Sequence, residues 1–125
     1  IAAGGAVVID PGSGRVLAEI GVFIGVATNN VAEYRGMIAG IEAASELAPG
    51  AALHVRMDSK LVVEQMSGRW KIKHPDMQEL ARQAKALIAG RHVRFEWVAR
   101  AENALADAAA NESMDRRESF RRDLA

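Results

Sequence analysis

The sequence predicts an α/β domain in which a β-hairpin comes first and later strands alternate with helices. Its 125 residues are enough for one domain with its own core, and they leave no room for a second domain. Apolar residues recur at period two in some segments and at helical spacing in others. Because helical crossovers join the later strands, we expect these strands to run parallel.

The hairpin and the first helix come first in the chain. Residues 6–25 read AVVIDPGSGRVLAEIGVFIG, two apolar runs around a turn that contains proline and glycine. The helix that follows carries an apolar stripe from Met37 to Leu47 and ends at Pro49-Gly50.

Strands and helices then alternate to residue 114. ALHVRMD and HVRFEWV each alternate apolar with polar side chains, as half-buried strands do. The expected order is a strand at 53–57, helices from 59 to 68 and from 75 to 90, a strand at 92–98 and a helix at 102–114. Because residues 115–125 are mostly charged, we expect a charged tail or linker there, after a domain at 1–114.

Composition excludes several classes of protein. Cysteine is absent, which removes disulfide frameworks, thiol catalysis and most zinc sites. Sixteen basic residues balance sixteen acidic ones, so a phosphate-binding surface must come from local clustering. The apolar runs are too short to cross a bilayer, and the first residues lack the pattern of a signal peptide. We therefore expect a cytoplasmic protein with no membrane partner.

Three acidic residues stand where ligands gather in α/β folds. Glu33 lies in the expected first turn of a helix, Asp58 directly follows a strand, and Asp107 lies in the helix after the last strand. The carboxyl ends of strands and the helices that leave them form a crevice. Carboxylates gathered there repel one another unless cations neutralise them, and such hard oxygen ligands suit Mg²⁺ or Mn²⁺.

Each acid also has a purely structural explanation. Asn30 and Glu33 have the spacing of a capping box, and Asp58 has the position to cap a helix that begins at Ser59. An aspartate among alanines, such as Asp107, usually has no function on an exposed helix. Taken singly, the acids are better explained in this way.

Taken together, the acids lie in segments that resemble motifs of the type 1 ribonuclease H family. These segments are TNNVAEY, MDSKLVVEQ and ENALADAAAN, in this order, and the resemblance covers residues 1 to about 114. It implies a ribonuclease H-like fold, a mixed five-stranded sheet flanked by helices on both faces. It also implies endonucleolytic hydrolysis of the RNA strand of RNA–DNA hybrids, with two divalent metal ions held by four carboxylates.

The family's functional residues carry over onto matching positions. Three of the four metal ligands correspond to Glu33, Asp58 and Asp107, which would hold two Mg²⁺ or Mn²⁺ ions when substrate is bound. Asparagine side chains of the family touch the minor groove of the hybrid, and the connector GRWKIKHP joins basic groups to an aromatic ring. The expected substrate-binding residues are Thr28, Asn29, Asn30, Lys60, Trp70 and Lys71. For Trp70, a role as the anchor of a turn stays open.

The family's first strand, which carries the fourth carboxylate, has no counterpart in the sequence. In the family it lies between the hairpin and the strand that ends at Asp58, so its absence predicts a gap with unpaired backbone on both sides. We expect that roughly 15 N-terminal residues are missing from the sequence, or that a second chain supplies the strand. The 125 residues alone are expected to be inactive.

A loop histidine that many members carry is also absent. The segment WVARAEN between the last strand and helix is short, and Arg100 is its only side chain with the charge to substitute. His54, His74 and His92 lie on expected strands or at a helix start, and we expect them at the surface.

Two alternatives to a nuclease stay open: a catalytically inactive hybrid-binding module, and a transposase or exonuclease relative of the same fold. The three acids argue against the first, since a pure binder has no need of mutually repelling carboxylates. The TNNVAEY segment argues against the second. The wording MDSKLVVEQMSGRWKIKHPDM resembles members in which a phosphatase-type domain follows, so a fused C-terminal domain is a further expectation.

Overall fold

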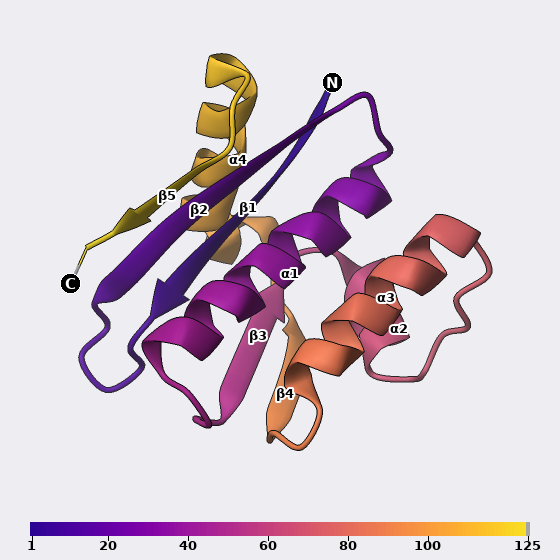
Figure 1. The fold of residues 1–125 in the computed structure, drawn as a ribbon, viewed down its shortest axis with the longest axis horizontal. Helices are drawn as coiled ribbons and strands as arrows, with labels where there is room; N and C mark the ends of the chain where they lie inside the picture. The colour runs from indigo at the N-terminus through magenta and orange to yellow at the C-terminus, as the bar shows by residue number, and fades with distance from the viewer. Residues whose placement is uncertain (125) are drawn as a thin grey trace.

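In the computed structural model, which describes residues 1–124, helices cover both faces of a layer of strands (Figure 1). The elements are β1 (Ala2–Ile9), β2 (Val16–Gly25), α1 (Asn29–Leu47), β3 (Leu53–Met57), α2 (Lys60–Met66), α3 (Pro75–Ile88), β4 (Val93–Trp97), the 3₁₀ helix η1 (Arg100–Asn103), α4 (Ala104–Arg116) and β5 (Phe120–Asp123). This order confirms the predicted α/β class.

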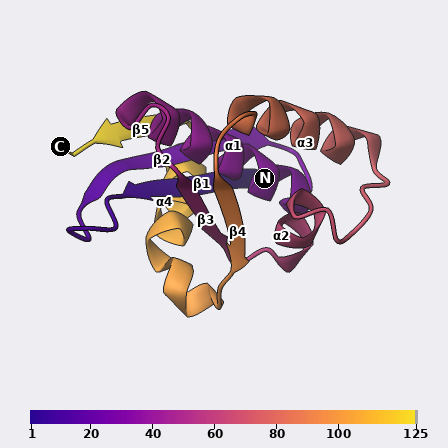
Figure 2. The same cartoon turned by 90° about the horizontal axis from the view of Figure 1, so that it is seen from below.

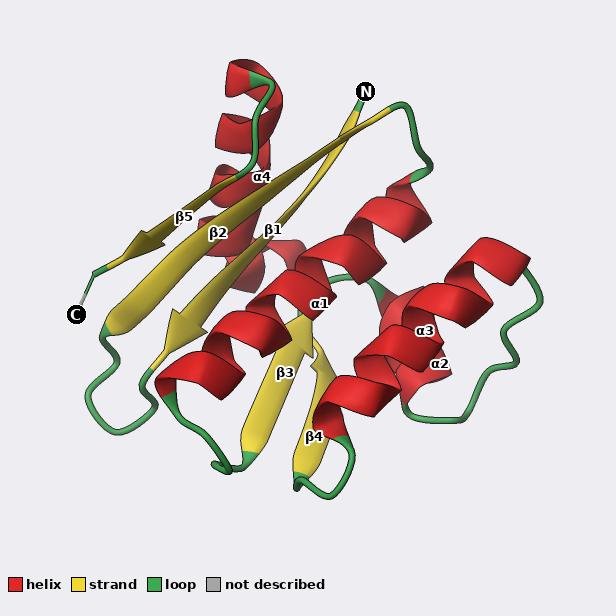
Figure 3. Cartoon of the chain, viewed as in Figure 1, coloured by secondary structure: helices red, strands yellow, loops and turns green. Residues whose placement is uncertain are grey.

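The strands form two sheets rather than one. Strands β1, β2 and β5 make an antiparallel sheet in the order β1-β2-β5, whereas β3 and β4 pair in parallel (Figure 3). The parallel pair confirms the crossover prediction. Among residues 1–124, strand β1 bonds to β2 only, and β3 bonds to β4 only. The gap predicted between the hairpin and β3 is therefore present, with one unpaired strand edge on each side of it.

Helices α1 and α4 lie on opposite faces of β1 (Figure 2), and a glycine pair allows both to approach it closely. A Cβ atom on Gly4 would lie 2.4 Å from the Ala32 carbonyl oxygen of α1, and one on Gly5 would lie 2.1 Å from the Ala106 carbonyl oxygen of α4. Successive strand residues point to opposite faces, so each glycine meets a different helix. The residues that follow Ala32 and Ala106 are the predicted acids.

The larger core cluster lies between α1, α2, α3 and the β3–β4 sheet. Its fully buried side chains include Tyr34 and Val62, and hydrophobic side chains such as Leu53 and Phe95 of the strands pack against them. Apart from Tyr34, its buried residues are Met, Ile, Val and Ala, in line with the low aromatic content. In the part of the chain that the structure describes, no helix is long and apolar enough to span a membrane.

The expected charged tail is wrong for most of residues 115–124. Helix α4 continues to Arg116, Arg117 turns the chain with φ 55°, and β5 then pairs with β2. Phe120 packs where β2 has Gly21, since a Cβ there would lie 2.5 Å from the Phe120 ring. Charged side chains of this segment make contacts within the fold. Arg122 bonds to Glu112, and its guanidinium lies over the Phe120 ring.

Candidate active site

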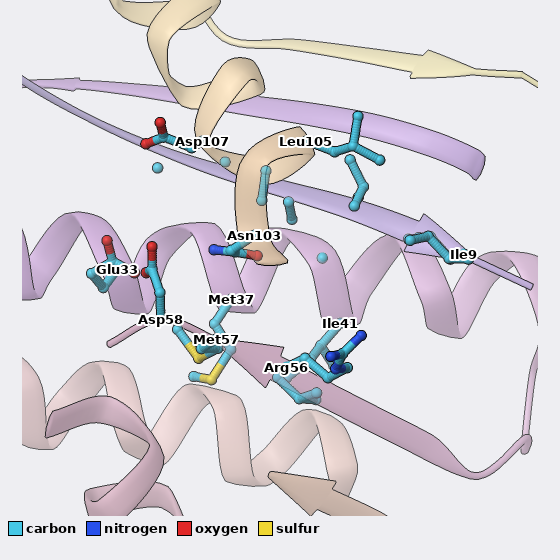
Figure 4. A pocket seen from close by; sticks show the side chains of 18 of the residues that line it. Ile9, Glu33, Met37, Ile41, Arg56, Met57, Asp58, Asn103, Leu105 and Asp107 are labelled. Carbon is cyan, nitrogen blue, oxygen red and sulfur yellow. The ribbon is translucent and has the colours of Figure 1, made fainter. Parts of the chain in front are cut away.

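All three predicted acids line one cavity of about 720 Å³ in the gap between β1 and β3. Its walls are the edge of β1, the edge of β3 and the facing sides of α1 and α4. In Figure 4 the carboxylates of Glu33 and Asp58 point to the same side, toward Asp107. The sequence thus predicted three residues that the fold brings to a common site.

Glu33 projects from the second turn of α1 and takes no part in capping the helix. The helix begins at Asn29, and the Thr28 hydroxyl is the cap, since it accepts a hydrogen bond from the Val31 amide at 3.2 Å. The capping box expected between Asn30 and Glu33 is therefore wrong, as is the first-turn position of the glutamate. Its carboxylate is free of the structural role that the sequence favoured.

Asp58 is not a helix cap either. Ser59 caps α2, where its hydroxyl accepts from the Val62 amide at 3.4 Å. The backbone of Asp58 is held from β4, because the Trp97 indole Nε1 donates to the Asp58 carbonyl oxygen at 3.1 Å. The sequence predicts Trp97 only as a strand residue, because a contact between residues 39 positions apart leaves no local signal.

Asp107 lies in the first turn of α4, just after η1. Its carboxylate forms an ion pair with Arg100, whose guanidinium lies 3.5 Å away. The Arg100 side chain is 80% exposed, so the pair contributes little to stability. Arg100 is nevertheless a cation at the edge of the cavity, where the family's loop histidine is absent.

The charges of the three acids act on one another. Burial raises the pKa of Glu33, the negative charges of Asp58 and Asp107 raise it further, and Arg100 opposes them. Such a site favours a cation, and carboxylate oxygens are the donors that Mg²⁺ and Mn²⁺ prefer. Within residues 1–124, however, no three acidic or histidine side chains are yet close enough to hold a metal ion. The donor chemistry fits a metal site, and the ligand set is incomplete.

The expected substrate-binding residues are all exposed. Thr28, Asn29 and Asn30 form the N-terminus of α1, and Lys60 begins α2. Trp70 and Lys71 lie in the connector between α2 and α3, where Trp70 is 45% exposed. The N-terminus of α1 therefore lies close to Glu33, and the N-terminus of α2 lies close to Asp58.

The three histidines lie at the surface, as expected. The His54 ring is 2.8 Å from the carboxylate of Glu96, and the His74 ring accepts from the Asp76 amide at the start of α3. Among the contacts described, none of the three rings is bonded to Glu33, Asp58 or Asp107, although Glu96, the partner of His54, also lines the cavity.

Comparison with known proteins identifies the family. A family model described as reverse transcriptase-like matches residues 1–113. The N-terminal RNase H domain of Rv2228c from Mycobacterium tuberculosis is 57% identical with a TM-score of 0.82, covering 89% of this chain and 80% of that one. RNase H1 from Halobacterium salinarum is 40% identical with a TM-score of 0.82, covering 90% of this chain and 85% of that one. The chain belongs to the type 1 ribonuclease H family.

A third similar structure is LC11-RNase H1, solved in complex with an RNA/DNA hybrid. It is 34% identical with a TM-score of 0.83, covering 90% of this chain and 84% of that one. The curated relatives are longer than this chain. It spans 30% of the length of the bifunctional protein Rv2228c of M. tuberculosis and 54% of the ribonuclease HI of H. salinarum.

Proposed function

We propose that this chain is the nuclease domain of an endonuclease that hydrolyses the RNA strand of RNA–DNA hybrids. The observation that carries the proposal is the meeting of Glu33, Asp58 and Asp107 at one cavity, where burial and the other two charges raise the pKa of Glu33. Membership of the ribonuclease H family supports it. So does the hybrid bound by LC11-RNase H1.

Glu33, Asp58 and Asp107 would hold two Mg²⁺ or Mn²⁺ ions. When bound, such ions supply an activated water and neutralise charge on the leaving oxygen. The chain itself supplies the anionic ligands from α1, from α4 and from the residue that follows β3. Arg100 is placed to balance the charge of Asp107 while the ions are absent.

The substrate would lie across the two helix N-termini. Thr28, Asn29 and Asn30 present a hydroxyl and two amides to the minor groove and backbone of the hybrid, beside the turn that holds Glu33. Lys60 and Lys71 would contact phosphates, and Trp70 would pack on a sugar or base.

An extended segment outside the 125 residues would fill the gap between β1 and β3. Both edges that line the cavity leave backbone groups without a partner in the sheet, and buried backbone groups require partners. A strand here would bring its side chains beside Glu33 and Asp58 and could supply the fourth carboxylate. The 125 residues alone would then be inactive. A protein that contains this segment is called the strand-complete protein below.

The proposal is tested with the substitution Asp58→Asn in the strand-complete protein. We expect cleavage of a labelled RNA–DNA hybrid to fall by three orders of magnitude or more, since one ligand of the proposed metal ions is neutralised. Binding of the uncleaved hybrid should remain. The matched control is Asp115→Asn, an exposed aspartate of α4 outside the cavity, which should leave the rate unchanged.

Other outcomes would favour the alternative functions. Retained turnover in the Asp58→Asn protein would overturn the assignment of Asp58. A wild-type protein that binds the hybrid without cutting it would be the inactive binding module. Preferential cleavage of duplex DNA or single-stranded RNA would indicate a transposase or exonuclease relative.

A fused phosphatase-type domain and a cytoplasmic location also belong to the proposal. The first is supported by the M. tuberculosis relative, which is named as bifunctional and of which this chain matches 30% of the length. Immunodetection of the native protein by size and by cell fraction tests both expectations.

A further inference from the structure

The core cluster contains a polar pair whose position calls for a physical reason. The Tyr34 hydroxyl donates to the Gln65 side-chain oxygen at 2.8 Å, with Tyr34 0% and Gln65 3% exposed. Their neighbours are Met, Ile, Val and Ala. Phenylalanine and leucine would fill the same space without polar atoms to satisfy, and a satisfied buried pair adds little net stability over such a replacement. The hydrogen bond between Tyr34 and Gln65 therefore fixes the positions of these side chains more than it stabilises the fold.

Gln65 also forms a hydrogen bond to the connector between α2 and α3. Its side-chain Nε2 donates to the Lys71 carbonyl oxygen at 3.5 Å. The connector, residues 69–74, has no helix or strand of its own, so its course depends on such contacts. The exposed side chains of Trp70 and Lys71 lie next to the carbonyl that Gln65 holds.

Other contacts fix the same connector from its two ends. At its start, the amides of Arg69 and Trp70 donate to the Glu64 carbonyl oxygen at 3.0 and 3.2 Å. At its end, the Gln78 side chain donates to the Ile72 carbonyl oxygen at 2.9 Å. Gln65 holds the middle by a hydrogen bond from within the core, against which the Ile72 side chain of the connector also packs.

The other end of the network lies beside a proposed metal ligand. Tyr34 follows Glu33 in α1, so the helix turn that aims Glu33 into the cavity sends the next side chain into the core. One chain of bonds thus runs from the turn of Glu33 through Tyr34 and Gln65 to the connector.

We propose that Tyr34 and Gln65 are positioning residues that hold Trp70 and Lys71 in the orientation that binds the hybrid. This inference rests on the proposed function, since it assigns the connector a nucleic-acid contact. Fixing the connector before binding removes the entropy cost of ordering two long side chains at the moment of contact. The network sets how tightly the hybrid binds, and the acids set how fast it is cut.

The test is the double variant Tyr34→Phe/Gln65→Leu in the strand-complete protein. Removing both partners leaves neither member of the buried Tyr34–Gln65 bond unpaired, and the carbonyl of the exposed Lys71 can bond to water instead, so the melting temperature should stay close to that of the wild type. Hydrogen exchange of the amides at 69–74 should become faster. Affinity for an uncleaved hybrid should fall on the order of fivefold to tenfold, with KM raised and kcat within about twofold of wild type.

The salt dependence of hybrid binding distinguishes a positioning role from a merely structural one, because a structural role alone would leave it unchanged. If Lys71 no longer meets its phosphate, the slope of log affinity against log salt should fall by about one. The control is Gln83→Ala, an exposed glutamine of α3 outside the connector, which should change neither the slope nor the affinity.

The outcomes separate this inference from the proposed function. Unchanged exchange at 69–74 in the double variant overturns the positioning role whatever the activity. Faster exchange with unchanged affinity and slope overturns the link to substrate while the nuclease proposal stands. A wild-type protein that binds no hybrid overturns both.

Discussion

The Tyr34 hydroxyl makes the stability of the fold sensitive to alkaline pH. Burial raises the pKa of Tyr34 from 10.0 to about 12, so the unfolded chain loses this proton before the folded chain does. The stabilisation is fully present below pH 10 and is lost as pH rises to about 12. The free energy of unfolding should fall by about 1.4 kcal/mol per pH unit in this window.

The measurement is urea unfolding from about pH 9 to about pH 12, compared with the Tyr34→Phe variant. Lysines also titrate in this range, so only the difference between the two slopes belongs to Tyr34. Tyr34 is the only tyrosine of the 125 residues, and its ultraviolet titration is therefore assignable. Equal slopes would show that the hydroxyl ionises freely in the folded state.

The position of a single residue in the fold was predictable where the residue belongs to a sequence motif. It was not predictable where only packing between distant elements determines it. That Glu33, Asp58 and Asp107 lie at one cavity was predictable because three motifs occur in one order, although local spacing favoured caps. The true caps, Thr28 and Ser59, lie two residues and one residue from the expected ones, a difference that depends on where each helix begins. Trp97 and Gln65 carry no local signal, since their partners lie in other elements.

At the scale of elements, β1 sets how far apart α1 and α4 lie. We expect Gly5→Ala to destabilise the fold by about 2 kcal/mol or more, because the added Cβ would lie 2.1 Å from the Ala106 carbonyl oxygen. Helix α4 would have to move, and Asp107 would move with it. In the strand-complete protein, cleavage should therefore fall as well.

Thermal unfolding of Gly5→Ala beside Gly12→Ala checks this expectation. A Cβ on Gly12 would meet only an Asp10 carboxylate oxygen at 3.5 Å, an ordinary contact, so this variant should unfold near the wild-type temperature. Equal melting temperatures for the two variants would mean that α4 does not depend on the close approach.

Elements with a strong period were predicted well, and β5 was not. The hairpin, the parallel strands and the four α-helices follow from apolar spacing and from Pro and Gly punctuation. Strand β5 has three charged residues among its four, and its pairing depends on Phe120 reaching Gly21 of β2. Such a contact, far apart in sequence, cannot be seen in the spacing of residues 115–125.

At the scale of the whole molecule, the gap between the two sheets predicts how the 125 residues behave alone. Amides on the gap side of β1 and β3 should exchange with solvent quickly, whereas those paired within β1–β2 and β3–β4 should be slow. An environment-sensitive apolar dye should bind the cavity. In the strand-complete protein the fast amides should become protected, the dye should be excluded, and the melting temperature should rise.

Exchange measured residue by residue on both forms provides the check. Identical protection of β1 and β3 in the two forms would contradict a strand in the gap. The gap was predicted from the family's strand order, so its presence between β1 and β3 was foreseeable from the sequence. The separation of the acids around it was not, because it depends on how α1 and α4 settle on β1.

Strand β5 also affects whether molecules of this protein associate with one another through their sheet edges. It covers the outer edge of β2, and three of its four residues, Arg121, Arg122 and Asp123, are charged. Charged, short edge strands are poor templates for pairing between molecules. A chain shortened before Ser119 would expose a long edge of β2 rich in Val, Ile and Phe, and self-association into fibrous aggregates would become the main hazard of handling it.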